Sequence, residues 1–357
     1  MDHRMRTDRI AGRLDALEVD AIVVTQPANV RYLTGFTGSN GQALVTSGAG
    51  VFFTDGRYTE QSRREVPQME RVTYRQNFAE VVRDACAANG VRRLGFEDGV
   101  VTVRTFRSLE GALQDVKLVA VGDAIDRERW VKDAEELALI QLAQDATDQA
   151  FEDVLEKLAV GMTERQVAQE IEHAMRRAGA DGLSFETIVA FGENAAEPHH
   201  EPGHRTLEDG DVVKMDFGAL WEGYHADMTR TVGFGTVGSE LRRIYAVVQE
   251  AQRAGLEAVR AGVTGGDVDA ASRRVVEEAG YGERFSHGLG HGVGLEIHEG
   301  PGLRREGTDE LPVGAVVTVE PGVYVPGLGG VRIEDMVEVR ADGGRVMPSS
   351  TKDLIEL

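Results

Sequence analysis

Two pairs of acidic residues stand in similar surroundings in the second half of the chain, and a histidine flanked by glycines lies between them. The pairs are Asp216 with Asp227 and Glu320 with Glu334, and the histidine is His291. In each pair the acids flank a short turn between two strand-like runs. Carboxylates and an imidazole in such runs could hold a metal ion and carry out hydrolysis.

The two turns predict how close the acids of each pair come. If the first hairpin is centred between Trp221 and Glu222, Asp216 and Asp227 stand directly opposite on one face, with Cβ atoms roughly 5 Å apart. The glutamate pair is placed in the same way about a loop centred near Gly327. Like charges opposite each other in an apolar sheet are costly unless a cation lies between them, so the pattern predicts a divalent metal.

The expected metal ligands are four carboxylates and one imidazole: Asp216, Asp227, His291, Glu320 and Glu334. This donor set suits hard or borderline divalent ions, with Mn²⁺ expected first and Co²⁺ and Zn²⁺ as alternatives. Two ions about 3.5–4 Å apart that share carboxylates form the usual arrangement of two-metal hydrolases. The alternative, that the acids are solvated strand and turn residues, is disfavoured because all four lie in apolar runs at duplicated positions.

An internal duplication surrounds these acids. Residues 161–167 resemble residues 262–268, and residues 212–218 resemble residues 316–322. A helix, a turn, a second helix and a hairpin therefore occur twice, and each copy supplies two of the carboxylates. We expect a closed domain with pseudo-two-fold symmetry, in which metal ions on the pseudo-axis receive ligands from both halves.

Length, charge and cysteine content set broader limits. The chain has 357 residues, more than one hydrophobic core usually organises, so we expect two domains. A formal net charge of −21 argues against nucleic acid or an anionic membrane as a partner. Cys86 is the single cysteine, which excludes an intrachain disulfide. The first residues lack an apolar signal core, and no run is long enough to span a membrane, so a cytoplasmic enzyme is expected.

The first third of the chain alternates strand-like and helix-like segments and is expected to form a small α/β domain over residues 1–122. Residues 123–131, rich in acidic and basic side chains, are expected to be a linker, and residues 132–357 the metal domain. Alternation and helical spacing predict strands over residues 21–25, a hairpin over 42–46 and 50–54, a helix over 77–89 and a strand over 92–97.

Two clusters of histidines accompany the acids. His287, His291 and His298 lie on a glycine-rich segment, where glycines allow close approach of a ligand to the backbone. Three histidines at this spacing suggest one metal ligand and two proton handlers or oxyanion donors. A second cluster lies on the loop of residues 198–204, which taken by itself is as consistent with a polar surface loop as with a functional one.

These motifs resemble the metallopeptidases with the pita-bread fold: aminopeptidase P, prolidase and methionine aminopeptidase. The resemblance spans essentially the whole chain, and its C-terminal motifs are highly specific. They are Asp216-Phe-Gly, Asp227-Met-Thr-Arg, His287-Gly-Leu-Gly-His291-Gly-Val-Gly, Glu320-Pro-Gly and Arg332-Ile-Glu334-Asp. Residues 29–39 and 54–58 look like the N-terminal domain of aminopeptidase P and prolidase, which methionine aminopeptidases lack. The resemblance implies a creatinase-like α/β N-terminal domain and an α+β, pseudo-two-fold pita-bread domain.

The resemblance also implies roles for individual residues. The five ligands match the family's positions one for one, with Asp227 and Glu334 expected to bridge two metal ions. Substrate-contacting roles are implied for four residues: His199, His287, His298 and Arg332.

In hydrolysis of the bond between an N-terminal residue and a following proline, Glu320 is the candidate for moving a proton from water to the proline nitrogen. His298 is expected to stabilise the oxyanion, and His199 to lie beside the substrate. Arg332 is expected to orient His287 or a metal-bound acid.

The chain departs from prolidases at one position, which favours aminopeptidase P with prolidase as the alternative. Many prolidases place an arginine four residues past the histidine matching His298, and this chain has Gly302 there, although Arg304 and Arg305 follow. His200 replaces the small residue usual after the histidine matching His199 and would narrow the site.

Two other function classes fit the architecture less well. Creatinase hydrolyses an amidino group without metal and lacks the full ligand set, and non-catalytic binding proteins on this fold typically lose ligands. All five are present here. We expect proline-containing peptides as substrate and, by analogy with related enzymes, a homodimer.

Overall fold

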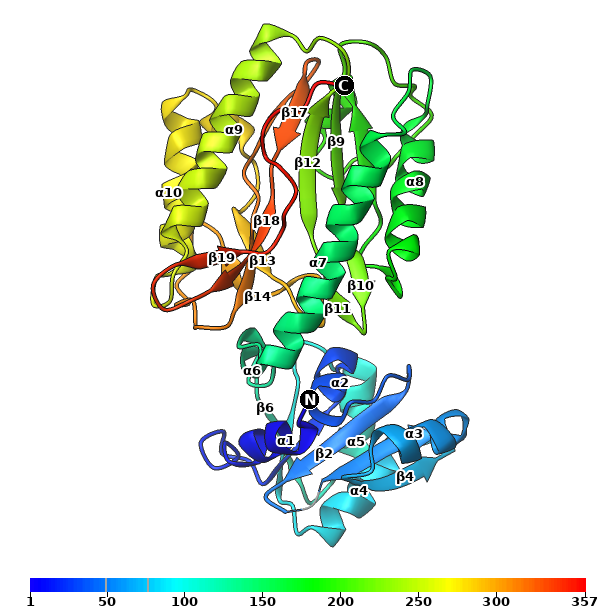
Figure 1. The fold of residues 1–357 in the computed structure, drawn as a ribbon. Helices are drawn as coiled ribbons and strands as arrows, with labels where there is room; N and C mark the ends of the chain where they lie inside the picture. The colour runs from blue at the N-terminus through cyan, green and yellow to red at the C-terminus, as the bar shows by residue number, and fades with distance from the viewer. Residues whose placement is uncertain (49, 76) are drawn as a thin grey trace. The chain divides into compact units, whose positions relative to one another are not determined.

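The computed structural model describes residues 1–48, 50–75 and 77–357 of the chain. The chain divides into two compact units, Met1–Arg129 and Trp130–Leu357 (Figure 1). The division falls within residues 123–131, the predicted linker. None of the helices among the described residues is long and apolar enough to span a bilayer.

The first unit is built on one mixed six-stranded sheet with strand order β4-β3-β2-β1-β5-β6. At its centre β1 is buried over all four residues, pairs antiparallel with β2 and pairs parallel with β5. The predicted hairpin of β2 and β3 is confirmed, as are the strands β1 and β5 and the helix α4. The elements of this unit are α1 (His3–Ala11), β1 (Ala21–Val24), α2 (Pro27–Thr34), β2 (Gly41–Thr46), β3 (Val51–Asp55), η1 (Gly56–Tyr58), α3 (Thr59–Glu65), β4 (Glu70–Tyr74), α4 (Phe78–Ala88), β5 (Arg93–Phe96), α5 (Val103–Ala112) and β6 (Lys117–Ala120). The short helix α6 (Asp126–Trp130) follows at the division.

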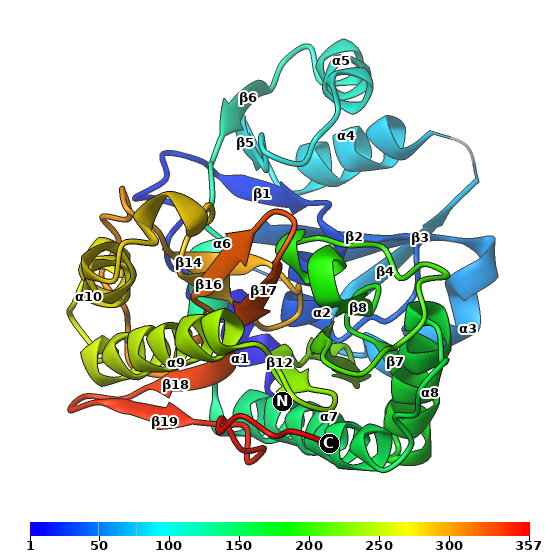
Figure 2. The same ribbon diagram turned by 90° about the horizontal axis from the view of Figure 1, so that it is seen from above.

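The second unit contains the predicted duplication. Figures 1 and 2 show the helix pair α7 and α8 on one side of the strands and the pair α9 and α10 on the other. The first repeat comprises α7 (Ala134–Leu155), α8 (Glu164–Arg177), β7 (Gly182–Leu183), β8 (Ile188–Phe191), η2 (Gly192–Ala196), β9 (Val212–Phe217), β10 (Ala219–Trp221), β11 (Tyr224–His225) and β12 (Met228–Gly233). The second comprises α9 (Ser239–Ala258), α10 (Gly265–Glu278), η3 (Gly282–Arg284), β13 (Gly290–Gly292), β14 (Glu299–Leu303), β15 (Val316–Val319), β16 (Gly322–Val325), β17 (Gly329–Arg332), β18 (Asp335–Val339) and β19 (Gly344–Val346).

Matching local interactions start the second helix of each repeat. Thr163 and Thr264 are the N-caps of α8 and α10, and each closes a capping box with the residue three positions later. Each of these threonines also forms an isolated antiparallel bridge to a downstream segment, at Thr206 and Glu310 respectively. The same capping chemistry therefore sets the start of the helix in both halves.

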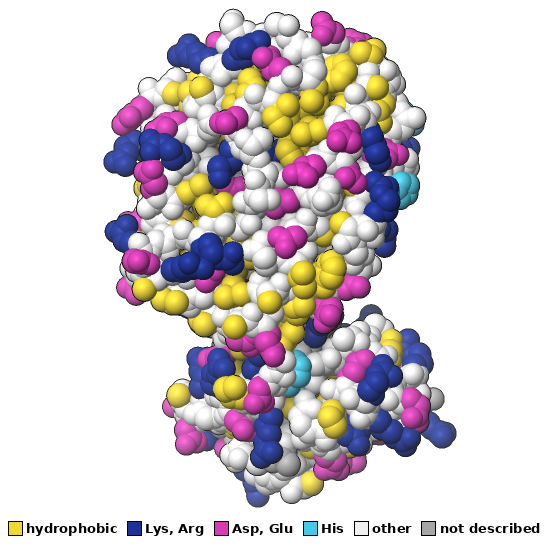
Figure 3. All heavy atoms as spheres, in the orientation of Figure 1, with side chains coloured by type: hydrophobic (Ala, Val, Ile, Leu, Met, Phe, Trp, Pro, Cys, Tyr) yellow, Lys and Arg dark blue, Asp and Glu magenta, His cyan; other side chains and the backbone are white. Residues whose placement is uncertain are grey.

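Each repeat has its own apolar core. One cluster joins α7 and α8 to β8, β9 and β12, and a second joins α9 and α10 to β15, β17 and β18. On the face drawn in Figure 3, basic and acidic side chains are interspersed over both units. The strands next to the acidic pairs are thus part of these cores, β9 and β12 of the first and β15, β17 and β18 of the second.

The first hairpin differs from its predicted register by two residues. Thr229, and not Asp227, is the partner of Asp216 across β9 and β12. The turn is the two-residue loop Glu222-Gly223, whose φ angles of 44° and 78° are both positive, as a type I′ turn requires. The prediction of direct opposition was therefore wrong, and Asp227 is two residues from the position opposite Asp216.

The second hairpin has the predicted register. Gly322 pairs with Arg332 in β16 and β17, and Val319 pairs with Asp335 in β15 and β18. Continuing this register through the interruption between the two ladders places Glu320 across from Glu334. At the interruption each glutamate backbone N–H bonds another part of the chain, at Leu289 O and Thr229 O. The hydrogen-bond ladder of the hairpin is therefore interrupted at its two acids, Glu320 and Glu334.

Candidate metal centre and active site

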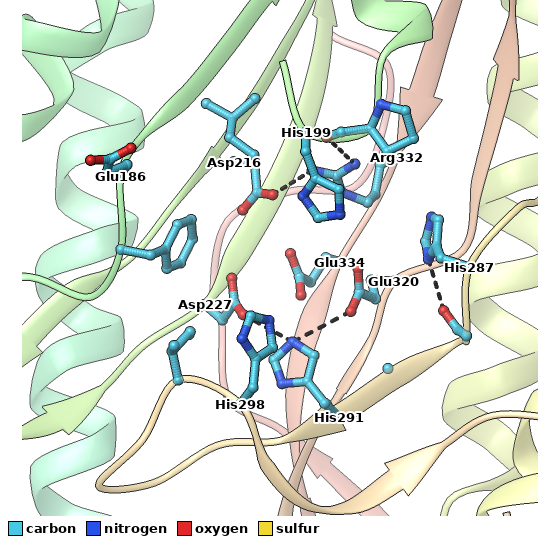
Figure 4. A pocket seen from close by; sticks show the side chains of 16 residues that line it. Glu186, His199, Asp216, Asp227, His287, His291, His298, Glu320, Arg332 and Glu334 are labelled. Carbon is cyan, nitrogen blue, oxygen red and sulfur yellow. Dashed lines mark hydrogen bonds and ion pairs between the residues drawn. The ribbon is translucent and has the colours of Figure 1, made fainter. Parts of the chain in front are cut away.

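The predicted site residues lie together around one cavity of about 430 Å³ in the second unit. Figure 4 shows the acids, histidines and arginine reaching into it from strands and loops of both repeats. The cavity is lined by Phe185, Glu186, Ile188, Pro198, His199, Asp216, Asp227, His287, Gly288, Gly290, His291, Ile297, His298, Glu320, Arg332 and Glu334. It therefore includes all five predicted ligands and all four of the predicted substrate-contacting residues.

Three of the predicted ligands form a compact cluster. Asp227, His291 and Glu334 each offer one ligand atom, and these atoms all lie within 4.8 Å of one another. His291 Nε2 is 3.5 Å from Asp227 Oδ2 and 3.5 Å from Glu320 Oε1. One imidazole nitrogen is thus surrounded by carboxylate oxygens from both halves of the unit.

The orientation of His291 is that of a metal ligand. Its Nδ1 is 3.1 Å from the Gly292 carbonyl oxygen, which can only accept, so Nδ1 carries the proton and Nε2 presents its lone pair to the carboxylates. Burial lowers the pKa of His291 to about 4, which keeps this ring neutral. A lone pair facing carboxylate oxygens is unfavourable unless a cation lies between them.

The surroundings of three of the carboxyl groups raise their pKa values. Burial, followed by the neighbouring charges of Glu334, Asp216 and Glu320, raises the pKa of Asp227 well above its ordinary value. Burial and then Glu320 raise the pKa of Glu334 in the same way. Burial raises the pKa of Glu320 to about 8. Without a cation these acids resist ionisation at neutral pH.

Divalent metal ions fit these residues. Asp216 lines the cavity together with the other ligands. Its Oδ1 is buried and has no hydrogen-bond partner among the described residues. Side chains from the surrounding strands orient two of the acids. Thr229 donates to Glu334 at 2.7 Å, and Thr318 donates to Glu320 at 3.2 Å. Oxygen-rich sites with one imidazole are typical of divalent transition-metal centres.

Metal removal is expected to make the stability of the protein fall as pH rises. Carboxyls whose folded pKa is raised contribute stability at low pH that is lost as pH rises through the folded pKa, which is about 8 for Glu320. The buried histidines act in the opposite sense, but only between about 4 and their ordinary value of 6.5.

Thermal unfolding of chelated protein between about pH 7 and about pH 9 should therefore show a decline, and saturating Mn²⁺ should raise the unfolding temperature most at the upper end. A midpoint for the metal-free protein that stays level over this range would contradict the electrostatic interpretation of the site.

Among the described residues, Arg332 is the only lysine or arginine that lines the cavity, and each of the three nitrogens of its guanidinium donates a hydrogen bond. It forms a close ion pair with Asp216, donates to Tyr324 Oη at 2.8 Å and to Pro198 O at 3.2 Å, and donates from Nε to Thr229 at 2.9 Å. Tyr324 Oη is also 2.9 Å from His287 Nε2. The predicted link between Arg332 and His287 therefore runs through Tyr324.

Other predicted positions lie outside this cavity. His200 and His204, on the same loop as His199, do not line it. Arg304 and Arg305 line an adjoining cavity of about 440 Å³, which shares only His287 and Gly288 with the first. Arg305 is paired with Glu277 at 3.0 Å, and Arg304 is exposed.

Several site residues were not identified from the sequence. Tyr324 could have been found by alternation, because residues 320, 322 and 324 share one face of a strand. Lys214 could have been found as a charge in the apolar run of β9, where it is fully buried. The lining residues Phe185, Glu186, Ile188 and Ile297 carry no signal that distinguishes them from ordinary loop or strand residues.

Two family models match the chain. One, described as metallopeptidase family M24, matches residues 138–341, and the other, described as the creatinase/prolidase N-terminal domain, matches residues 6–131. The chain is 32% identical to an Xaa-Pro dipeptidase of Pyrococcus furiosus over 352 residues, covering 98% of this chain and 99% of that protein. Both units of the structure are thus covered by known families.

Solved structures agree with these matches. An Xaa-Pro dipeptidase from Bacillus anthracis has a TM-score of 0.97 at 37% identity and covers 100% of both chains. An X-Pro aminopeptidase from Thermotoga maritima has a TM-score of 0.91 at 34% identity and covers 99% of this chain and 100% of the other. The chain therefore belongs to metallopeptidase family M24, with a creatinase-type N-terminal domain and a pita-bread catalytic domain that carries a candidate metal site.

Proposed function

We propose that this metallopeptidase is an Xaa-Pro aminopeptidase, which hydrolyses the bond between an N-terminal residue and a following proline in peptides longer than two residues. The observation that carries this choice is the engagement of Arg332, the only lysine or arginine in the cavity lining, with Asp216, Tyr324 and Pro198. A dipeptidase needs a cation for the carboxylate that immediately follows the scissile bond. Among the described residues that line the cavity, there is no guanidinium or ammonium group besides that of Arg332 to meet that need.

Five side chains would hold the metal ions: Asp216, Asp227, His291, Glu320 and Glu334. Divalent ions bound there supply Lewis acidity toward the scissile carbonyl and lower the pKa of a water molecule. We propose Mn²⁺ as the ion, with Co²⁺ and Zn²⁺ as alternatives.

The residues of the chain then perform the proton transfers and the orientation of the substrate. Glu320 takes a proton as water adds to the carbonyl carbon and gives it to the proline nitrogen as the C–N bond breaks. His298 donates a hydrogen bond to the developing oxyanion. His199, on the exposed side of the cavity, binds the carbonyl beyond the scissile bond. Arg332 positions His287 through Tyr324.

A second candidate function, Xaa-Pro dipeptidase, has support from the names of relatives and from one structural feature. The proteins of Pyrococcus furiosus and Bacillus anthracis described above are named Xaa-Pro dipeptidases. Arg304 is an exposed cation on the adjoining cavity, which meets the first at His287 and Gly288. If Arg304 reaches the carboxylate of a bound dipeptide, it replaces the arginine that is absent at Gly302.

The two functions separate in one experiment with Mn²⁺-loaded protein and the matched peptides Ala-Pro and Ala-Pro-Ala. We expect release of alanine from the tripeptide. Cleavage of Ala-Pro alone would establish the dipeptidase, and replacement of Arg304 by alanine should then raise the KM for it. Failure to cleave either peptide, with metal content confirmed, would refute both assignments.

We further propose a homodimeric, cytoplasmic enzyme. This proposal rests on the behaviour implied by the family resemblance.

A further inference from the structure

The loop that carries His199 is held by a single buried carboxylate, that of Glu164. Glu164 is the first residue of α8, and its side chain is 0% exposed. Its Oε1 accepts from the Phe191 backbone N–H at 2.9 Å and from Asn194 Nδ2 at 2.9 Å. Its Oε2 faces His200 Nε2 at 3.0 Å and accepts from the Gly203 backbone N–H at 2.9 Å. Residues before and after His199 therefore bind the same carboxylate, and His199 lies on the loop between them.

Two basic side chains hold the other side of the same loop: Arg332, and Lys214, whose pKa burial lowers to about 6. Lys214 donates to Ala195 O at 3.3 Å and bonds the Glu197 carbonyl oxygen closely, and Arg332 donates to Pro198 O at 3.2 Å. These contacts fix the backbone immediately before His199. The contacts of His200 with Glu164 fix the backbone immediately after it. His199 thus lies between two anchors, and its direction into the cavity depends on both.

The contacts of His200 require a doubly protonated ring. Its Nδ1 is 2.7 Å from Glu197 Oε2, and its Nε2 is 3.0 Å from Glu164 Oε2. Ionised carboxylates only accept hydrogen bonds, and only the imidazolium form of histidine donates from both nitrogens. The side chains of His200 and Glu164 are 12% and 0% exposed, so water does not readily replace this contact, whereas the side chain of Glu197 is 69% exposed.

We infer that His200 is a positioning residue, which as an imidazolium ties the His199 loop to Glu164 and so fixes where the His199 side chain enters the cavity. This inference rests on the proposed function insofar as His199 is taken to bind substrate.

The second repeat shows that this anchor belongs to the His199 loop and not to the shared scaffold. Gly265 occupies the position of Glu164 at the start of α10. A Cβ atom there would lie 2.1 Å from the Gly302 carbonyl oxygen, so backbone packs where the first repeat has a carboxylate. The first residue of the helix therefore binds a loop through its carboxylate in the first repeat and allows close backbone packing in the second.

The charge state of His200 makes the anchor sensitive to pH. Burial alone would lower the pKa of His200, but hydrogen bonds to Glu197 and Glu164 outweigh burial, and the net change in this pKa is a rise. The charged groups that face it are Glu164 from α8 and Glu197 from its own loop; Arg205, close to Glu164, is itself paired with Asp211 at 2.7 Å. A raised histidine pKa means that the anchor is complete at low pH and is lost as pH rises through the folded value.

The test compares His200→Gln with His204→Gln, which makes the same change at an exposed histidine of the same loop. The kcat and KM for Ala-Pro-Ala are measured from about pH 6 to about pH 9 with Mn²⁺-loaded proteins. For the unaltered protein we expect KM to rise with pH by about tenfold, the equivalent of one charge-assisted hydrogen bond. His200→Gln should show at every pH the high KM that the unaltered protein reaches at high pH, since glutamine donates without titrating. Its kcat should stay within about twofold of that of the unaltered protein. His204→Gln should follow the unaltered protein.

Glu197→Gln gives an independent check, because it keeps His200 but removes one of its two anionic partners. It should move the KM inflection to lower pH. A His200→Gln enzyme with the KM and pH profile of the unaltered protein would overturn the inference. If the unaltered protein cleaves neither Ala-Pro-Ala nor Ala-Pro, the proposed function fails instead, and imidazole NMR decides the role of His200. A ring that titrates above the ordinary histidine value, and at lower pH in Glu197→Gln, supports it; an ordinary titration in both overturns it.

Discussion

Replacement of Asp227 by asparagine is expected to lower kcat/KM by about a thousandfold or more, a loss of about 4 kcal/mol of transition-state stabilisation. Asp227 is 5% exposed, and its ligand atom lies within 4.8 Å of those of His291 and Glu334. Asparagine keeps the shape of the side chain but removes the negative charge that holds a divalent ion. Metal content, measured by elemental analysis, should fall together with activity.

The folded state should survive this substitution, which distinguishes it from a variant that misfolds. Glu334, Asp216 and Glu320 all raise the pKa of Asp227, so a neutral amide relieves repulsion in the metal-free protein. At about pH 8 the unfolding temperature of metal-free Asp227→Asn should equal or exceed that of the metal-free parent. Asp342→Asn, in the exposed turn between β18 and β19, is the matched control. An Asp227→Asn protein that keeps its metal and its activity would remove Asp227 from the ligand set.

Replacement of Glu320 by glutamine is expected to lower kcat by about 10²–10⁴-fold, the range typical of a lost general acid–base residue. Glu320 lines the cavity together with the other acids, where it can take a proton from water and return it to the leaving nitrogen in one reaction cycle. Glutamine can neither take up nor release that proton. KM for Ala-Pro-Ala should change much less, because binding does not require the transfer.

Metal content separates the proton-transfer role of Glu320 from its role as a ligand. If Glu320→Gln binds as much Mn²⁺ as the parent and still loses kcat, proton transfer accounts for the loss. A loss of activity that excess Mn²⁺ restores in full would show that Glu320 serves only to hold the ion. Glu152→Gln, the same change on the exposed face of α7, should behave like the parent.

The sequence was informative about the site because the chemistry is concentrated in strands with strong patterns. The acids interrupt apolar runs, and the register about Gly327 followed from symmetric spacing of Glu320 and Glu334. The first hairpin was harder, because its turn could be centred at more than one place. The structure selects Glu222-Gly223, where the glycine takes the second left-handed position at no cost and only Glu222 must adopt an unusual φ.

Interactions between distant segments could not be predicted from local patterns. Nothing in the sequence around Glu164 indicates that its carboxylate would bind a loop residue 36 positions later at His200. The pairing of Arg332 with Asp216 spans 116 positions, and its hydrogen bond to Tyr324 depends on how β16 pairs with β17. Such contacts arise only once the two repeats have packed, so local patterns could single out the acids and His291 but not the particular acid that Arg332 pairs with or the part played by Tyr324.

The division of the ligands between the two repeats bears on how such a chain could have arisen. Asp216 and Asp227 belong to the first repeat, and His291, Glu320 and Glu334 to the second, so neither alone has a complete set. An ancestor with one repeat would have needed a twin to gather comparable ligands. In a single chain with two copies, neither copy has to supply the same residue at both places. The two copies differ in this way at an equivalent position, with the carboxylate of Glu164 in one half and the bare backbone at Gly265 in the other.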